Sequence, residues 1–296
     1  MAAVGVAMSL VSASAGAQTL YAASFRSSAL GGNDGIAGSL YTVNLASGSA
    51  TYVAPIRLGG NQPLGVTGLA VHPSTGVFYA ITSLLSPTAP QSLVTIDPAT
   101  GKATLIGDLR FPCSDITFNR AGILFAWLAG SSQLGIVNLT TGAVTPIGPS
   151  RGPGPPAGLA IDSAGVAYIT PGGAGGTLDT VDIATGNVKP GPQLTGAPFP
   201  AGINSMTFSP SGLLLAVNSN GGSPASTRLV TINTSTGAVS SIGTLPDDTD
   251  ALTFLSESRR GELSAVNVQT LALLVLGAIA LVLGLIGWFV GRKPRA

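Results

Sequence analysis

The chain has 296 residues, of which 8% are charged, and its 13 basic and 12 acidic side chains leave a formal charge of +1. Soluble domains usually carry about 25% charged residues, and this chain has no basic cluster outside its extreme C-terminus, so it is not expected to bind nucleic acid. With one cysteine, Cys113, and one histidine, His72, it cannot form an internal disulfide or a Cys/His zinc site. We expect no metal and no cofactor.

The first 17 residues are an apolar run that ends in the small residues Ala15, Gly16 and Ala17. Such a run is typical of a secretory signal peptide, which is removed on export. We therefore predict that residues 1–17 are a signal peptide and that the mature protein begins at Gln18. The alternative is a buried N-terminal strand or helix.

A nine-residue pattern, L-x-x-[VI]-[ND]-x-x-[ST]-G, occurs five times in the middle of the chain. Its copies begin at Leu40, Leu93, Leu134, Leu178 and Leu229, roughly 40 to 55 residues apart. In each copy, alternating residues predict a strand, the Asn or Asp binds the backbone of its own turn, and the final glycine supplies a positive φ angle. Each copy therefore predicts a β-hairpin.

A second hairpin pattern precedes most of these copies, and its turn glycines are Gly76, Gly122, Gly165 and Gly212. One further copy is divided between the chain ends, because residues 250–254 match its first strand and residues 19–23 match its second. A last strand that pairs with the first closes a ring, whereas a linear solenoid needs capping repeats. We predict an all-β fold, a five-bladed β-propeller over residues 18–256 that is closed by its N- and C-terminal strands.

In the predicted blades, an inner strand ends in Asp-Pro or Ser-Pro, and a turn glycine and then Leu-Tyr-Ala follow. This arrangement resembles the secreted bacterial β-propellers of the YVTN and NHL type, over essentially the whole of residues 18–256. The resemblance implies the fold more strongly than a function, because such propellers serve as binding platforms, as surface-layer components and occasionally as enzymes.

Candidate binding residues lie in the long connections between predicted blades, on the face of the propeller opposite the tight turns. Arg57, Arg110 and Arg151 fall in successive connections that enter the innermost strands of three neighbouring blades. We expect them to converge at the mouth of the channel and to bind an anionic group of an extracellular glycan or protein partner. Lys102 and Arg120 are expected on the tight-turn face. The alternative is scattered, solvated charge.

Asp115 and Asp250 are the carboxylates on the predicted inner strands. Two carboxylates at the channel would suit the acid and base steps of glycan cleavage, and the alternative is that they cap strand starts. We predict an extracytoplasmic binding module that performs no chemistry, with no committed catalytic residue. The alternatives are a glycan hydrolase or lyase that uses these two aspartates, and a structural component of a surface layer or matrix.

The C-terminal region predicts a membrane anchor. Residues 271–291 are uncharged, and as a helix they would span about 32 Å, which matches the hydrocarbon core of a bilayer. Arg292, Lys293 and Arg295 follow, so we expect residues 292–296 in the cytoplasm and the propeller in the periplasm or outside the cell. Residues 257–270 are the linker. The last 30 residues or so resemble the PEP-CTERM sorting tails of bacterial surface proteins, although no Pro-Glu-Pro precedes the helix; the alternative is a buried globular helix.

Overall fold

The computed structural model describes residues 18–24, 38–59, 64–154, 157–171, 176–196, 202–219 and 226–256. Thr19–Leu255 form one compact unit, and the statements below concern this unit. The predicted signal peptide, linker, membrane-spanning helix and basic tail lie outside the described residues. Within those residues, no helix is long and apolar enough to cross a membrane.

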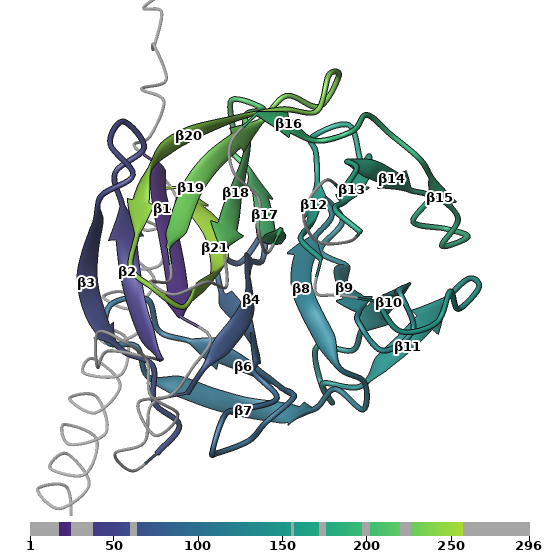
Figure 1. The fold of residues 1–296 in the computed structure, drawn as a ribbon. Helices are drawn as coiled ribbons and strands as arrows, with labels where there is room; N and C mark the ends of the chain where they lie inside the picture. Colours follow the sequence, from purple (N-terminus) through teal and green to yellow (C-terminus); the bar gives the residue numbers. More distant parts are fainter. Residues whose placement is uncertain are drawn as a thin grey trace, which may run out of the picture. The chain divides into compact units, whose positions relative to one another are not determined.

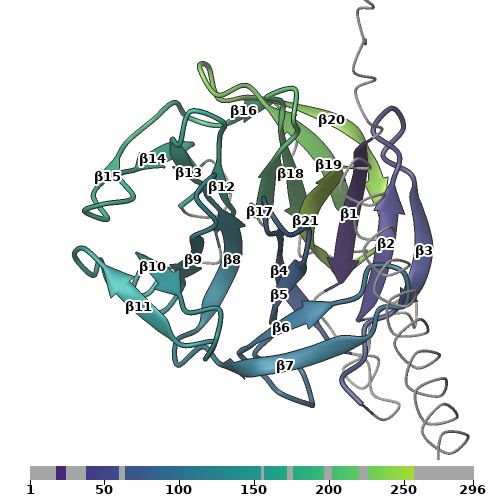
Figure 2. The same cartoon turned by 180° about the vertical axis from the view of Figure 1, so that it is seen from behind.

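The described residues form 21 strands, which assemble into five sheets arranged around a central axis (Figures 1 and 2). Blade 1 consists of β21 (Thr249–Ser256), β1 (Gln18–Ser24), β2 (Ser39–Val43) and β3 (Ala50–Pro55). Blade 2 consists of β4 (Val66–Val71), β5 (Phe78–Thr82), β6 (Ser92–Ile96) and β7 (Ala103–Asp108). Blade 3 consists of β8 (Cys113–Phe118), β9 (Leu124–Leu128), β10 (Gln133–Val137) and β11 (Val144–Ile147).

The last two blades follow the same order from the axis outwards. Blade 4 consists of β12 (Leu159–Ile161), β13 (Ala167–Ile169), β14 (Asp179–Val181) and β15 (Val188–Lys189). Blade 5 consists of β17 (Ile203–Phe208), β18 (Leu214–Ser219), β19 (Thr227–Ile232) and β20 (Ala238–Leu245). The short strand β16 (Thr195–Gly196) pairs in parallel with β20 from outside. The predicted five-bladed propeller is thus confirmed.

The ring closes in the predicted way, because β1 lies between β21 and β2 in one sheet. The C-terminal strand therefore supplies the innermost position of the blade that the N-terminal strand begins. Closure removes an unpaired sheet edge, which would otherwise be open to association with other strands.

The nine-residue pattern forms the outer hairpin of each blade, as predicted. In the first copy, Asn44 Oδ1 accepts hydrogen bonds from the backbone N–H groups of Ala46 (2.9 Å) and Ser47 (3.2 Å). The final glycines all have positive φ angles, between 69° and 79°: Gly48, Gly101, Gly142, Gly186 and Gly237.

These turn glycines have a second role that sequence reasoning missed, because each lies against the preceding blade. A Cβ atom on Gly48 would lie 2.7 Å from the Cα atom of Gly243 in β20. The equivalent contacts join Gly101 to Pro55, Gly142 to Gly107, Gly186 to Gly148 and Gly237 to Gln193. The backbones of neighbouring blades therefore approach too closely for any side chain at this position.

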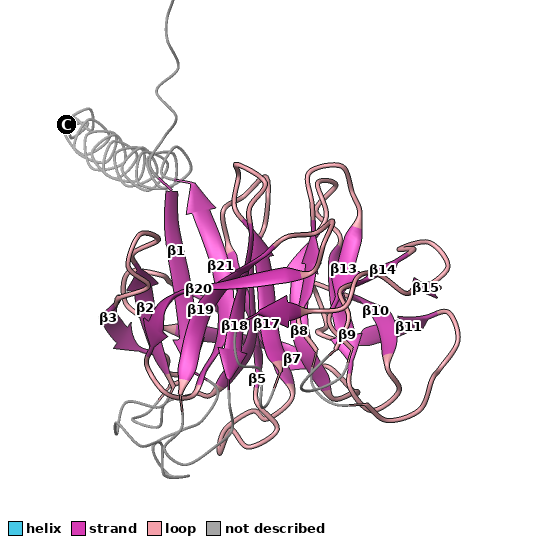
Figure 3. Ribbon diagram, turned by 45° about the horizontal axis from the view of Figure 1, so that its top comes forward, coloured by secondary structure: helices cyan, strands magenta, loops and turns pink. Residues whose placement is uncertain are grey.

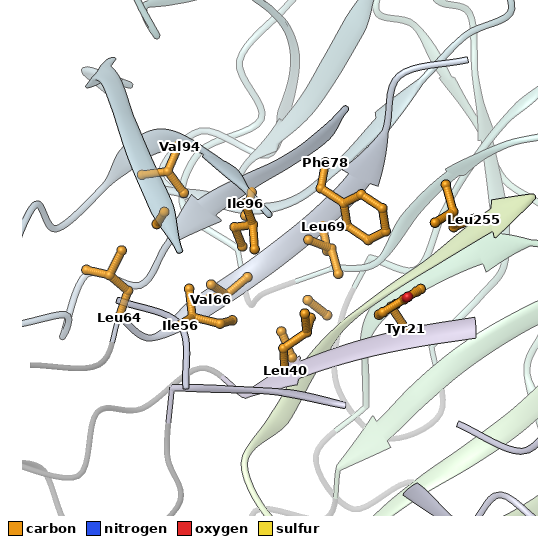
Figure 4. Close-up of a cluster of buried hydrophobic side chains, with 14 residues drawn as sticks. Tyr21, Leu40, Ile56, Leu64, Val66, Leu69, Phe78, Val94, Ile96 and Leu255 are labelled. Atoms are coloured by element: carbon orange, nitrogen blue, oxygen red, sulfur yellow. The ribbon is translucent and has the colours of Figure 1, made fainter. Parts of the chain in front are cut away.

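The hydrophobic core lies between the blades. Figure 4 shows the cluster between blades 1 and 2, where Tyr21 of β1 and Leu255 of β21 lie near Phe78 of β5. The rings of Tyr21 and Phe78 meet edge to face, with centroids 5.1 Å apart. Since burial of such a side chain contributes about 1.5–3 kcal/mol, the packing of blade on blade stabilises the closed ring.

Candidate functional site

The innermost strands β21, β4, β8, β12 and β17 surround the axis of the propeller (Figure 1). The aligned repeats place residues of the five strands at equivalent positions, which form successive layers along the axis. We call the first the axial layer, and it consists of Gly68, Asp115, Gly158, Ser205 and Ala251. The next is the apolar floor, which consists of Leu69, Ile116, Leu159, Met206 and Leu252.

Asp115 holds the axial layer together through both of its carboxylate oxygens. Its Oδ2 accepts hydrogen bonds from the backbone N–H groups of Leu159 (2.9 Å) and Met206 (3.0 Å), in β12 and β17. Its Oδ1 accepts from Ile116 N–H (2.9 Å) and from the Ser205 hydroxyl (3.3 Å). All three N–H groups belong to the apolar floor, so one carboxylate satisfies equivalent donors of three blades.

A fourth blade joins this network through Ser205. The hydroxyl of Ser205 accepts a hydrogen bond from Leu252 N–H (3.2 Å) in β21, at the same position as the other three donors. The remaining members of the axial layer are small, and a Cβ on Gly68 would lie 2.9 Å from Ile116 N. Small neighbours therefore leave the space at the axis that the Asp115 carboxylate fills.

Burial raises the pKa of Asp115 well above the ordinary value for aspartate. The hydrogen bonds from Leu159, Met206 and Ile116 favour the ionised form and oppose this shift, while the nearby Asp250 carboxylate raises the pKa further. Asp115 is completely buried. This geometry is that of a group that holds strands together, and it goes beyond the strand-start cap considered from the sequence.

Asp250 lies one position before the axial layer, on β21, and only 8% of its surface is exposed. Burial raises its pKa well above the ordinary value, Asn204 opposes the shift by hydrogen bonding, and Asp248 adds to it. Its Oδ1 atom is buried and has no hydrogen-bond partner among the described residues. Both predicted catalytic candidates are thus enclosed groups.

A pocket of about 400 Å³ opens on the other side of the apolar floor, and we call it the mouth pocket. Its base is formed by Leu69, Ile116 and Met206. Above them lie the threonines of three blades, Thr117, Thr207 and Thr253. The next layer is an apolar collar that consists of Val71, Phe118, Ile161, Phe208 and Phe254.

The mouth pocket opens on what we call the hairpin face, which carries the turns β4–β5, β8–β9, β12–β13 and β17–β18. In Figure 3 the strands run between two ends that carry the loops, and this face is one of those ends. From the sequence, function is expected on the opposite face, where several connections lie partly outside the described residues. Recurrence of Thr-Phe at 117–118, 207–208 and 253–254 is the sequence signal that would have indicated this pocket.

Polar groups at the edge of the pocket are engaged in their own turns. Asn119 Oδ1 accepts from Ile123 N–H (2.9 Å), and Asp162 Oδ1 accepts from Val166 N–H (2.9 Å). Deeper in the pocket, no hydrogen bond to another described residue engages the hydroxyls of Thr117, Thr207 and Thr253. These hydroxyls are therefore available to a ligand.

The turns around the pocket expose aliphatic side chains, which we call the aliphatic rim. Ile123, Val166 and Leu213 each follow the turn glycine of a different blade and are 41%, 38% and 46% exposed. His72 occupies the turn of blade 2, where its Nδ1 lies 3.3 Å from the backbone N of Ser74. His72 therefore caps its own turn.

The structure places the predicted arginines away from the mouth pocket. Arg57 follows β3, and its backbone N–H donates to the carbonyl of Gly101 (3.1 Å) at the junction with blade 2. There it pairs with Lys102 in a parallel bridge. The expectation that Arg57 and Lys102 occupy opposite faces is therefore wrong, because the end of an outer strand meets the next blade's outer turn.

Arg110 and Arg151 are exposed, and each lies at a different position along its connection. The carbonyl of Arg57 accepts a hydrogen bond from Ala103 N–H (2.9 Å) in the next blade. The carbonyl of Leu109 accepts the equivalent bond from Val144 N–H (3.1 Å), so Leu109, and not Arg110, occupies the position of Arg57. Among the described residues, no hydrogen bond or ion pair joins the three arginines, and their convergence stays a prediction. Arg120 lies in the β8–β9 turn, on the tight-turn face where it was expected, and it lines the mouth pocket.

Comparisons with known proteins bear on the fold. No protein-family model matches the sequence, and no curated protein matches it. A solved structure described as a nidogen/laminin complex contains a chain with 14% identity and a TM-score of 0.51, and the match covers 80% of this chain and 98% of that one. Virginiamycin B lyase from Staphylococcus aureus matches with 17% identity and a TM-score of 0.40, over 69% of this chain and 62% of that one. At 14% identity the likeness to the chain of the nidogen/laminin complex concerns the fold alone. Together with the five sheets around one axis, it shows that this chain is a β-propeller repeat protein.

Proposed function

We propose that this protein is an exported, membrane-anchored β-propeller that binds a protein partner on its hairpin face. The mouth pocket carries this proposal, because it combines unengaged hydroxyls and aromatic walls with the surrounding aliphatic rim. Exposed apolar patches with a polar border are typical of protein-interaction sites. The similarity to a propeller solved in a nidogen/laminin complex agrees with a protein-binding role.

The pocket supports binding rather than catalysis. Asp162 is the one carboxylate among its described lining residues, and that group is engaged in its own turn. The enzyme alternative relies on Asp115 and Asp250, which are buried and lie below the floor of the pocket. A general acid or base must reach a substrate atom within hydrogen-bond distance, directly or through one water.

Export and anchoring rest on the apolar N-terminal run and on the uncharged segment 271–291 with its basic end. Limited proteolysis of spheroplasts tests this part of the proposal. We expect protease to digest the propeller while residues 292–296 stay protected. An accessible tail with a shielded propeller would reverse the orientation, and release of the protein by mild salt would exclude a membrane span.

Site-specific photo-crosslinking tests the hairpin face in the cells that produce the protein. A photoreactive residue at Ile123 or Leu213 should give a discrete adduct with a second protein, which mass spectrometry identifies. Leu105 on β7 and Ile136 on β10 are matched controls, because they are exposed aliphatic residues (47% and 38%) on strands rather than in the turns of the hairpin face. Equal adducts from both pairs of positions would contradict a dedicated hairpin-face site, and adducts with a second copy of the chain would favour the structural alternative.

A further inference from the structure

We infer that the mouth pocket receives an uncharged side chain with an apolar body and a hydroxyl tip, of which tyrosine is the clearest case. This inference rests on the proposed protein-binding function and specifies what the partner inserts. It differs from the anionic ligand that the arginines suggested, because the described lining of the pocket has a different chemistry.

The charge of the pocket excludes a charged insert. Among the described lining residues, Arg120 is exposed at the edge and Asp162 is engaged by backbone N–H groups of its turn. The inner layers present hydroxyl and apolar groups. A carboxylate or ammonium group that entered these layers would lose its hydration and gain no opposite charge, which is strongly unfavourable.

The three threonines of the pocket, Thr117, Thr207 and Thr253, favour an insert whose tip forms hydrogen bonds. Thr117 and Thr207 are half-buried and Thr253 is buried, and they come from blades 3, 5 and 1. A hydroxyl both donates and accepts, so a ligand hydroxyl at this depth can pair with one threonine as donor and with another as acceptor. An insert without a polar tip would displace water from these hydroxyls and leave them unpaired, which costs free energy.

The apolar collar favours an insert whose apolar part, next to that tip, is aromatic. Phe118 packs against His72 with ring centroids 4.9 Å apart and against Tyr79 at 5.5 Å, and Phe208 packs against Tyr168 at 5.5 Å. These neighbours hold the collar in place before a ligand binds, which lowers the entropic cost of binding. Aromatic rings favour offset or edge-to-face contacts with such walls. The volume of about 400 Å³ lies in the usual range for ligand pockets.

Binding of small uncharged probes to the full chain in detergent tests this inference by ligand-observed NMR. The probes are N-acetyl-tyrosinamide, N-acetyl-phenylalaninamide and methyl glucoside. We expect the tyrosine probe to bind about five-fold or more tightly than the phenylalanine probe, which corresponds to one hydrogen bond. The double variant Thr117→Val, Thr207→Val keeps the shape of the side chains and should abolish this preference.

The matched control is Thr104→Val, Thr145→Val, which changes exposed threonines on β7 and β11 and should keep the preference. Equal binding of the two amino-acid probes, binding of methyl glucoside alone, or binding of no probe would overturn the inference. The preference of the unmodified chain for the tyrosine probe over the phenylalanine probe tests the inference even if the double variant fails to fold. If crosslinks form at Ile123 and Leu213 without a tyrosine preference, only this inference fails. A tyrosine preference without crosslinks would refute the protein partner.

Discussion

Replacement of Asp115 by asparagine should destabilise the propeller while leaving its outer surface unchanged. The substitution keeps one acceptor oxygen and turns the other into an N–H₂ donor. If the amide nitrogen replaces Oδ2, it faces the N–H groups of Leu159 and Met206, which then lack an acceptor. If it replaces Oδ1, the donors left without an acceptor are Ile116 N–H and the Ser205 hydroxyl.

The magnitude follows from the number of buried donors that lose a partner. Each such donor costs about 1–3 kcal/mol, so two of them cost about 2–6 kcal/mol. Part of this loss is offset, because asparagine carries no charge and its burial avoids the cost that raises the pKa of Asp115. We expect a net loss of about 2–4 kcal/mol in the free energy of unfolding. In a domain of this size, that loss lowers Tm by roughly 10 °C.

Thermal unfolding followed by circular dichroism or calorimetry measures this effect. Asp108→Asn is the control, because Asp108 is an exposed aspartate whose Oδ1 accepts one local hydrogen bond from Arg110 N–H. It should change Tm by no more than about 2 °C. A Tm for Asp115→Asn within 2 °C of the unmodified protein would refute the assignment of Asp115 as the group that joins the inner strands of the blades.

Three further predictions concern other parts of the ring. Because burial raises the pKa of Asp250 in the folded state, its contribution to stability is greatest below the unfolded pKa of about 4 and is lost as pH rises towards the folded pKa. The Tm of Asp250→Asn relative to the unmodified protein should therefore increase from pH 4 to pH 8, and a constant difference would contradict this. Gly142→Ala should cost about 2–4 kcal/mol in chemical denaturation, because its Cβ would clash with the backbone of Gly107. Gly165→Ala should cost about 1 kcal/mol, because its φ angle is also positive but its Cβ would meet no described atom within 4 Å; equal losses would exclude the contact between blades. Deletion of residues 18–24 removes β1 from between β21 and β2 and should abolish cooperative unfolding, so a truncated chain that melts within a few degrees would show that closure is dispensable.

The hairpins could be predicted from sequence because their geometry is local. The Asn44 side chain binds N–H groups two and three residues further along the chain. Gly48 adopts a positive φ angle, which a residue without a Cβ atom allows. Ring closure was also readable, because the divided repeat at residues 19–23 and 250–254 has no partner unless the two ends share a blade. The hairpins depend on residues close together in the chain, and ring closure depends on the number of repeats. Both can be read from the linear sequence.

The candidate site was decided by tertiary structure. Asp115 accepts hydrogen bonds from Leu159 and Met206, which lie 44 and 91 residues further along the chain, and no local pattern marks such partners. The pairing of Arg57 with Lys102 likewise depends on where the end of one blade's outer strand meets the next blade. The sequence by itself determined where the turns lie and which segments form strands. The approach of five inner strands at one axis determined which groups are buried, which hydroxyls line the pocket, and on which face the pocket opens.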